Sequence, residues 1–192
     1  MSPSLDIPIL TFETLQAWTD WLELQPAPTP GVWLKLAKAE SKILSITYAE
    51  ALDVALCYGW IDSQKKGFDE QFWLQKFTPR RAGSIWSKVN CEKAEALIAS
   101  EAMKPSGLRE VELAKQDGRW ERAYDSQSKS VIPADFQAAL DQSPAAQAFF
   151  VKLNSANRYA FLFRIQTAKK AETRAERIKK FVAMLERGEA LH

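Results

Sequence analysis

Residues 47–77 read TYAEALDVALCYGWIDSQKKGFDEQFWLQKF, and this stretch predicts a helix followed by a β-hairpin. Thr47 and Glu50 form a capping box, in which each side chain satisfies a free backbone N–H at the start of a helix. Gly59 is expected to end that helix, because glycine readily adopts the left-handed conformation found beyond a helix C-terminus.

Segments typical of strands follow the helix. Residues 60–66 and 71–77 form the two arms of the predicted hairpin, and the loop 67–70 between them has suitable turn residues. A further strand is expected at 32–38, where apolar residues alternate with other residues. The sequence therefore predicts a small, mostly antiparallel sheet of about three strands in the N-terminal half.

Most of the remaining chain is predicted to be helical. A helix is expected over 11–24, and the last one over 171–187 has apolar residues at helical spacing. Residues suited to a helix start precede or open the helices: Thr11, Asn90, Pro105, Pro133, Ser143 and Ser155. The predicted fold class is α+β and predominantly helical, with the sheet in the N-terminal half and a helical C-terminal half.

The pattern also predicts a division of the chain into regions. Residues 125–132 read DSQSKSVI and are polar and rich in serine, which is typical of a linker. We therefore expect an N-terminal α+β region over 1–124, a linker over 125–132 and a C-terminal helical region over 133–192.

The composition excludes several kinds of catalytic site. The chain has 192 residues, a net charge of +2 and one histidine, His192, at its C-terminus. A histidine-dependent triad or an ordinary zinc site therefore cannot be assembled from these residue types. No glycine-rich phosphate loop is present among the seven glycines. We expect no metal site and no cofactor, and we interpret Cys57 as a buried free thiol.

The N-terminal segment suggests where the protein acts. The first 15 residues show no basic segment followed by an apolar one, so they do not resemble a signal peptide. No apolar run reaches the ~20 residues of a membrane-spanning helix. These features favour the cytoplasm.

The strongest candidate binding segment runs from Gly59 to Asn90. Guanidinium groups beside aromatic rings and small polar side chains can hold a phosphate or carboxylate. If Asn90 caps the following helix, the free backbone N–H groups of the first helical turn would also attract an anion. Alternatively, Arg80 pairs with Asp62 or Asp69, and the tryptophans belong to the core. The candidate residues in this segment are Trp60, Asp62, Arg80, Arg81, Trp86, Lys88 and Asn90.

A second candidate lies on the last helix. Arg174 falls within its apolar stripe and Arg177 lies along the edge, so a charge is expected on the buried side. Such a charge requires a partner. One interpretation is an internal salt bridge, for which the acidic N-terminal helix is a candidate partner. A second is a shared anion pocket or docking face, and both arginines are therefore candidate ligand-binding residues. A third is a solvated basic face.

Several motifs resemble the YdeI/OmpD-associated family, which is also labelled bacteriocin-protection or OmdA. The motifs are 51–62 with CYGWID, FTPRR at 77–81, WSKVN at 86–90 and AKKAETRAERI at 168–178. The resemblance implies a role of a bacterial protein in envelope stress or in resistance to bacteriocins and cationic antimicrobial peptides. It also implies association with an outer-membrane porin, and it transfers no catalytic residue.

Three functional hypotheses follow. The first is a non-enzymatic protein that binds a small anionic ligand or a protein partner. The second is nucleic-acid binding through the basic last helix, which a net charge of +2 does not favour. The third is an enzyme that uses Asp62, Lys65 or Tyr58 in acid–base chemistry.

Overall fold

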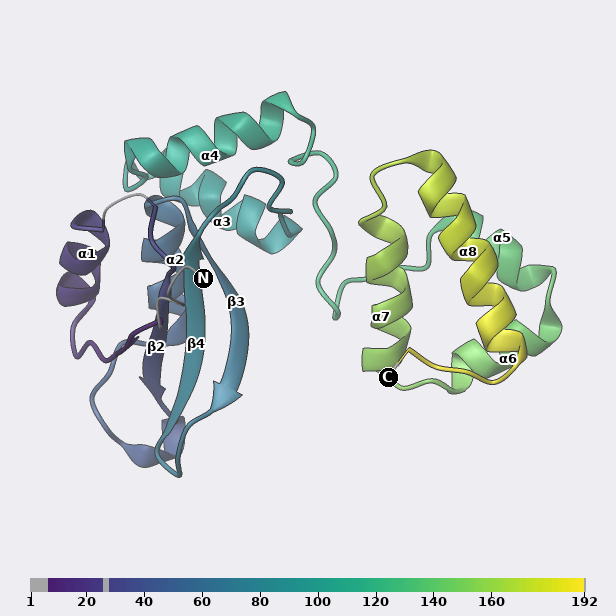
Figure 1. The fold of residues 1–192 in the computed structure, drawn as a ribbon, viewed down its shortest axis with the longest axis horizontal. Helices are drawn as coiled ribbons and strands as arrows, with labels where there is room; N and C mark the ends of the chain where they lie inside the picture. The colour runs from purple at the N-terminus through teal and green to yellow at the C-terminus, as the bar shows by residue number, and fades with distance from the viewer. Residues whose placement is uncertain (1–6, 26–27, 192) are drawn as a thin grey trace, which may run out of the picture. The chain divides into compact units, whose positions relative to one another are not determined.

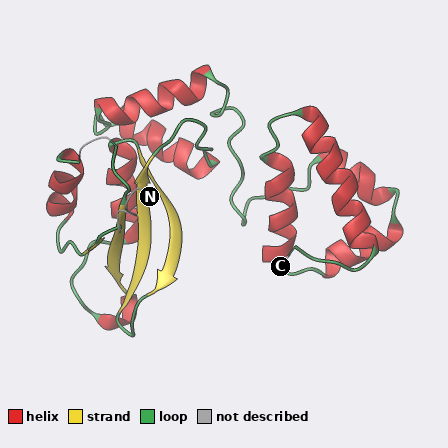
Figure 2. Ribbon diagram, viewed as in Figure 1, coloured by secondary structure: helices red, strands yellow, loops and turns green. Residues whose placement is uncertain are grey.

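The structure is a computed structural model that describes residues 7–25 and 28–191, so His192 lies outside the described residues. Within these ranges there are eight α-helices and one four-stranded sheet (Figures 1 and 2). The sheet lies in the N-terminal half and the C-terminal half is helical, which confirms the predicted fold class.

The chain forms two compact units. Unit 1 comprises Met1–Ser84 and Glu92–Asp117, and unit 2 comprises Ile85–Cys91 and Gly118–His192. The expected linker at 125–132 contains no helix or strand. The proposed regional boundaries of the chain remain a prediction.

Unit 1 combines the sheet with several helices. The strands lie in the order β1-β2-β4-β3. In chain order, the elements are β1 (Ile9–Leu10), α1 (Leu15–Glu23), β2 (Val32–Ala37), the 3-10 helix η1 (Ala39–Ser41), α2 (Tyr48–Cys57), β3 (Trp60–Gly67), β4 (Phe72–Pro79), α3 (Lys88–Ala99) and α4 (Pro105–Gln116). The first residues of α3 group with unit 2.

The sheet confirms the predicted hairpin and adds one strand. β4 pairs antiparallel with both β2 and β3. β1 pairs parallel with β2, through Ile9 and Leu10 opposite Trp33 and Leu34. This strand has only two residues, which is too short for an alternating pattern to be recognised in the sequence.

The hydrophobic core of unit 1 lies on the sheet face that α1 and α2 cover. Leu34 and Leu36 are buried there, as the alternation of β2 predicts. Trp18 of α1 is fully buried, and its ring centroid lies 5.6 Å from that of Phe77. Its indole N–H donates to the carbonyl of Ala51 at 3.1 Å. This bond satisfies the polar end of a large aromatic side chain and ties α1 to α2.

The ends of α2 are set by the residues that the sequence indicates. The Thr47 backbone N–H donates to Glu50 at 2.8 Å, and the Glu50 N–H donates to the Thr47 hydroxyl at 3.3 Å. Bonds from Thr47 lower the pKa of Glu50. Gly59, just beyond the helix, has a φ of +76°, which glycine adopts without steric cost.

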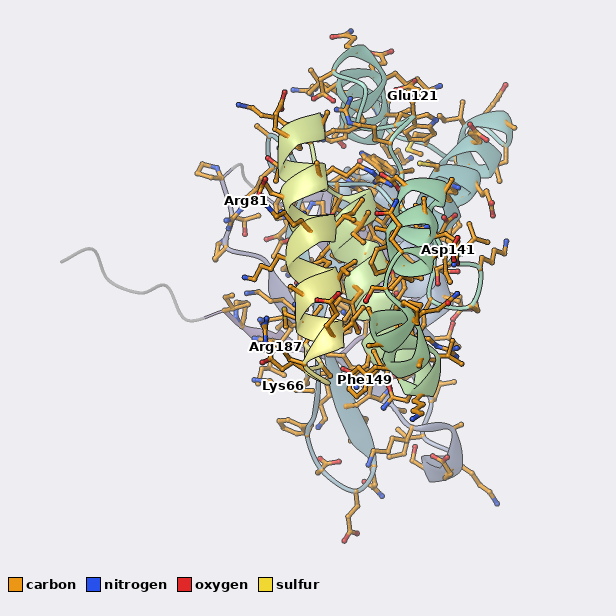
Figure 3. All side chains as sticks on the ribbon, turned by 90° about the vertical axis from the view of Figure 1, so that its right-hand side faces the viewer. Lys66, Arg81, Glu121, Asp141, Phe149 and Arg187 are labelled. Atoms are coloured by element: carbon orange, nitrogen blue, oxygen red, sulfur yellow. The ribbon has the colours of Figure 1, made fainter. Side chains whose placement is uncertain are left out.

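Unit 2 is built around a helical core. Its main helices are α5 (Ala134–Asp141), α6 (Pro144–Lys152), α7 (Ser155–Gln166) and α8 (Ala171–Glu186). The large apolar side chains of the core are Phe136, Leu140, Phe150, Phe161, Leu162, Ile165, Ile178, Phe181 and Leu185. Phe149, labelled in Figure 3, packs against them. In the described part of the chain, no helix has both the length and the apolar character of a bilayer span.

Three predicted helix caps are wrong by one to three positions. Thr14, not Thr11, accepts the capping bond of α1, and Asn154 precedes Ser155 as the cap of α7. Asn90 is not a cap, because the Ser87 hydroxyl accepts a bond from its backbone N–H at 3.1 Å. In each case a second residue with a suitable side-chain oxygen lies close by in the sequence.

We expect Gly107→Ala to destabilise unit 1 by about 1–3 kcal/mol, because added volume in a tight contact forces backbone shifts. A Cβ at this position would lie 2.3 Å from the Cys57 carbonyl oxygen and 2.4 Å from the Met103 sulfur. Gly67→Ala is the matched control, since a Cβ there would meet no described atom within 4 Å. Urea unfolding followed by tryptophan fluorescence measures both variants. Equal losses of stability would contradict the close contact.

Candidate functional site

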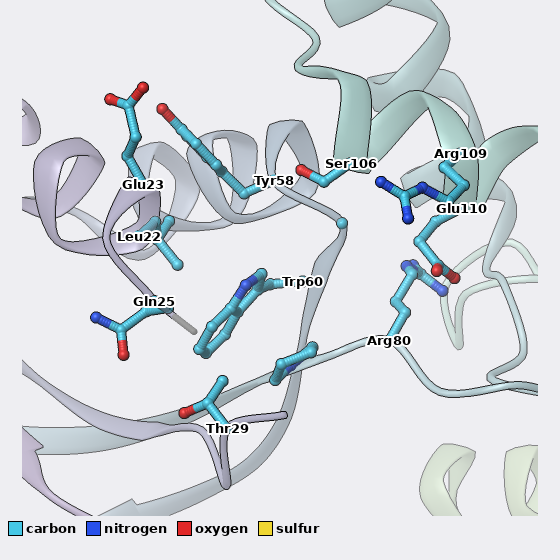
Figure 4. A pocket seen from close by; sticks show the side chains of 12 residues that line it. Leu22, Glu23, Gln25, Thr29, Tyr58, Trp60, Arg80, Ser106, Arg109 and Glu110 are labelled. Atoms are coloured by element: carbon cyan, nitrogen blue, oxygen red, sulfur yellow. The ribbon is translucent and has the colours of Figure 1, made fainter. Parts of the chain in front are cut away.

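A pocket of about 410 Å³ in unit 1 contains two of the candidate ligand-binding residues, Trp60 and Arg80, and also Tyr58, a candidate for acid–base chemistry. Its walls come from the end of α1, the junction of α2 with β3, the end of β4 and the first turns of α4 (Figure 4). The lining residues are Leu22, Glu23, Gln25, Thr29, Tyr58, Gly59, Trp60, Pro79, Arg80, Ser106, Arg109 and Glu110.

The backbone around Gly59 positions these walls. The left-handed turn places Tyr58 and Trp60 on either side of the glycine, and both side chains line the pocket. The Gly59 carbonyl accepts a bond from the Arg80 N–H at 2.9 Å, and Trp60 pairs with Pro79 in the sheet. The pocket is therefore anchored to backbone hydrogen bonds of the sheet.

One end of the pocket carries two arginines. Arg80 is 7% exposed, whereas Arg109 is exposed. In Figure 4 the side chains of Arg80 and Glu110 point toward each other, and Arg109 and Ser106 lie nearby on α4. Guanidinium groups at a pocket wall can donate paired hydrogen bonds to a carboxylate or phosphate.

The other end carries Glu23 and Tyr58, whose polar groups lie near each other in Figure 4. The Tyr58 hydroxyl is buried and has no hydrogen-bond partner among the described residues. Burial raises the pKa of Tyr58, and the negative charge of Glu23 adds to this effect. The phenol therefore remains protonated at neutral pH and can donate a hydrogen bond to a ligand.

The remaining candidates of unit 1 lie outside the pocket. Asp62 accepts a hydrogen bond from the Tyr48 hydroxyl at 2.9 Å. Asp69, the other acid considered for Arg80, accepts the backbone N–H groups at the start of β4. Arg81 is exposed (Figure 3) and does not line the pocket.

Three candidates belong to unit 2. Trp86 is buried, and its ring centroid lies 4.9 Å from that of Trp120. Lys88 forms an ion pair with Asp125 at 2.7 Å. Asn90 is buried in the first turn of α3, where the hydroxyl of Ser87 occupies its backbone N–H. The anion site expected at an Asn90 cap therefore has no basis in the helix geometry.

The arginines of α8 contact acceptors within unit 2. Arg174 binds both carboxylate oxygens of Asp135, at 2.6 and 2.8 Å, and donates to the Ile165 carbonyl at 2.9 Å. Arg177 donates to the carbonyl of Arg164. The internal salt bridge considered for Arg174 is present, but its acid comes from α5 and not from the N-terminal helix.

Residues of the pocket that the sequence does not single out come from distant segments. Glu23 ends α1, whereas Ser106, Arg109 and Glu110 lie on α4. The sequence feature that could have indicated this arrangement is the pair Gly59 and Gly107. Glycines at these two positions allow α4 to pack closely on the end of α2. The prediction for Cys57 is confirmed: the thiol is free and buried, and burial raises its pKa.

Comparisons with known families divide the chain into two matches. Residues 10–110 match a family described as "Domain of unknown function (DUF8412)". Residues 129–188 match a family described as "Bacteriocin-protection, YdeI or OmpD-Associated", so the resemblance seen in the sequence is confirmed for the C-terminal part. No curated protein and no solved structure matches the chain.

The Arg174–Asp135 pair predicts a pH-dependent contribution to the stability of unit 2. Hydrogen bonds from Arg174 lower the pKa of Asp135 below its ordinary value of 3.8. The unfolded state then binds more protons, so the contribution is present above pH ~4 and is lost as pH falls through the folded pKa. Because both side chains are partly exposed, we expect roughly 0.5–1 kcal/mol at pH 7.

Asp135→Asn tests this contribution. Hydrogen exchange of α5 and α8 amides at pH 7 should show faster opening in the variant, and the difference should shrink as the pH falls below the ordinary aspartate pKa of 3.8. Asp141→Asn is the control, because its described side-chain partners are the amides of Gln137 and Gln147. The same loss in both variants at pH 7 would argue against a specific role of Arg174.

Proposed function

The chain belongs to the DUF8412 family through residues 10–110, and we propose that its N-terminal unit is a non-enzymatic domain that binds a small ligand with an anionic group. The observation that carries the proposal is the Arg80 guanidinium, which is almost fully buried in the wall of a pocket beside Trp60 and Arg109. A volume of about 410 Å³ falls in the range of small-molecule sites.

The lining supports a ligand with a polar group at each end. Arg80, Arg109 and Ser106 would receive a carboxylate or phosphate, since guanidinium groups match the geometry of these anions. Trp60 and Leu22 offer apolar contact in the middle of the pocket. The Tyr58 hydroxyl would donate to an acceptor near the opposite end.

The same residues favour binding over acid–base catalysis. Of Asp62, Lys65 and Tyr58, only Tyr58 lines this pocket. Its raised pKa makes the phenol a poor base at neutral pH. The described residues also contain no cluster of three or more histidine, cysteine or acidic residues that could hold a metal ion.

The C-terminal match connects the chain to bacteriocin protection at the level of the family. We propose that ligand recognition by unit 1 serves this role. Nucleic-acid binding through α8 receives less support, because Arg174 and Arg177 are engaged by acceptors of unit 2.

Arg109→Ala tests the anionic end of the pocket. Phenyl phosphate and phenylacetate are suitable probes, since each joins an anionic group to a ring of modest size. We expect the variant to bind the better probe about tenfold more weakly, as charge-assisted hydrogen bonds contribute on the order of 1.5–3 kcal/mol. Titrations followed by NMR shifts of arginine and indole N–H groups give the dissociation constants.

Arg81→Ala is the matched control for that experiment, because Arg81 is exposed and lies next to Arg80 outside the pocket. Benzyl alcohol tests whether the charge matters, since it retains the ring without the anion. Equal weakening by the two variants, or equally tight binding of benzyl alcohol, would contradict an anion site at Arg109.

Tyr58→Phe separates a ligand contact from a structural bond. We expect no loss of stability, because the hydroxyl is buried without a described partner. Tyr48→Phe should cost about 1 kcal/mol, because it removes the bond to Asp62. Urea unfolding compares the two variants, and probe titrations should show weaker binding for Tyr58→Phe. A stability loss in Tyr58→Phe equal to that in Tyr48→Phe would assign its hydroxyl a structural role.

A further inference from the structure

The second face of the sheet in unit 1 carries lysines and aromatic rings. In β2 and β4 the residues that alternate with the buried core point away from α1 and α2. We call this surface the open face and define it by Trp33, Lys35, Lys66, Phe68, Phe72, Leu74 and Lys76, where Phe68 is the hairpin residue next to the strands. None of these residues lines the pocket.

The lysines of the open face lie over its rings. The Lys35 ammonium is 4.0 Å from the ring centroid of Phe72 and 4.7 Å from that of Phe68. The Lys66 ammonium is 4.2 Å from the Trp33 ring centroid, and that of Lys76 is 5.8 Å from it. These are cation–π distances. Each of these rings thus has at least one ammonium group close to it.

The open face is cationic and has few exposed apolar groups. Leu74, at its centre, is only 1% exposed although it points away from the core helices. It pairs with Lys35 and Lys66 in the sheet, whose long aliphatic stems can cover it. The one acid in β2, β3 and β4, Asp62, pairs with Phe77 and therefore lies on the helix-covered face.

We propose that the open face binds single-stranded nucleic acid. Aromatic rings offer stacking surfaces for bases, and the adjacent ammonium groups offer partners for phosphates. A base that stacks on Trp33 or Phe72 would take the place of a lysine on the ring, and that lysine would move to the neighbouring phosphate. The combination of flat rings and cations on three paired strands matches a chain in which bases and phosphates alternate.

Other polyanions match the open face less well. An anionic membrane would favour protruding apolar side chains, but of the large apolar residues that define this surface only Phe68 is well exposed, at 48%. An acidic peptide would use the lysines and leave the rings without a stacking partner. The rigid bases of a duplex are paired and stacked, so a duplex cannot place them on the rings.

Fluorescence anisotropy with a labelled 12-nucleotide oligothymidylate tests the proposal on the full chain. We expect binding at 50 mM salt that weakens steeply at 200 mM. Lys66→Gln with Lys76→Gln should reduce the slope of log affinity against log salt by about 1.4, because each phosphate contact on a single strand contributes about 0.7. Phe68→Leu with Phe72→Leu should weaken binding roughly tenfold through lost stacking.

Lys104→Gln with Lys115→Gln is the matched control, since it removes two exposed charges at the ends of α4, which contributes no residue to the open face. Circular dichroism and the melting temperature verify that every variant is folded. If a double variant of the open face does not fold, the corresponding single variants at Lys66, Lys76, Phe68 or Phe72 replace it. The control pair should bind the oligonucleotide as the unchanged protein does.

Three results would overturn the proposal. One is the absence of oligonucleotide binding at 50 mM salt, and another is an equal loss of affinity in the control pair. The third has two parts. Inorganic polyphosphate, a DNA duplex or phosphatidylglycerol vesicles bind as tightly as the oligonucleotide does, and the phenylalanine substitutions do not change the affinity for the oligonucleotide. Because the pocket shares no residue with the open face, failure here leaves the proposed ligand site untouched.

Discussion

The left-handed backbone at Gly59 constrains the arrangement of unit 1. It lets α2 lead directly into β3, so Tyr58 and Trp60 reach the same pocket. The Gly59 carbonyl also holds the end of β4 through the N–H of Arg80. A Cβ on this glycine would lie 3.0 Å from the Ser106 carbonyl oxygen, so α4 approaches more closely than a larger residue would allow comfortably. A single backbone conformation thus joins three walls of the pocket.

Features that depend on neighbouring residues could be predicted from the sequence. The capping box of Thr47 and Glu50 needs only four consecutive residues, and Pro105 at the start of α4 needs no partner at all. The alternation of β2 places Leu34 and Leu36 in the core because a strand has a period of two. Trp60 and Arg80 could be proposed as candidates from residue type alone, because guanidinium groups and aromatic rings lie close together in that segment of the sequence.

Features that depend on distant residues could not be predicted in the same way. The position of Arg174 in an apolar stripe predicts that it pairs with an acidic residue, but the sequence does not indicate which one. The partner in the structure, Asp135, lies 39 positions away. Glu23 and Arg109 enter one pocket only after α1 and α4 have packed. Even the local choice between Ser87 and Asn90 as a cap depends on the position of the first helical turn, which propensity alone does not fix.

The open face shows how one backbone irregularity redistributes charge. Asp62 pairs with Phe77, but Lys65 pairs with Gln75, so β3 contains one extra residue between these pairs. Strict alternation from Asp62 would point Lys66 toward the helix-covered face. The bulge shifts the alternation by one residue and brings Lys66 over Trp33 on the open face, while Asp62 remains beside Tyr48. The bulge therefore places Lys66 on the open face while Asp62 and Lys65 stay on the helix-covered face, so the open face carries lysines and no acid along its strands.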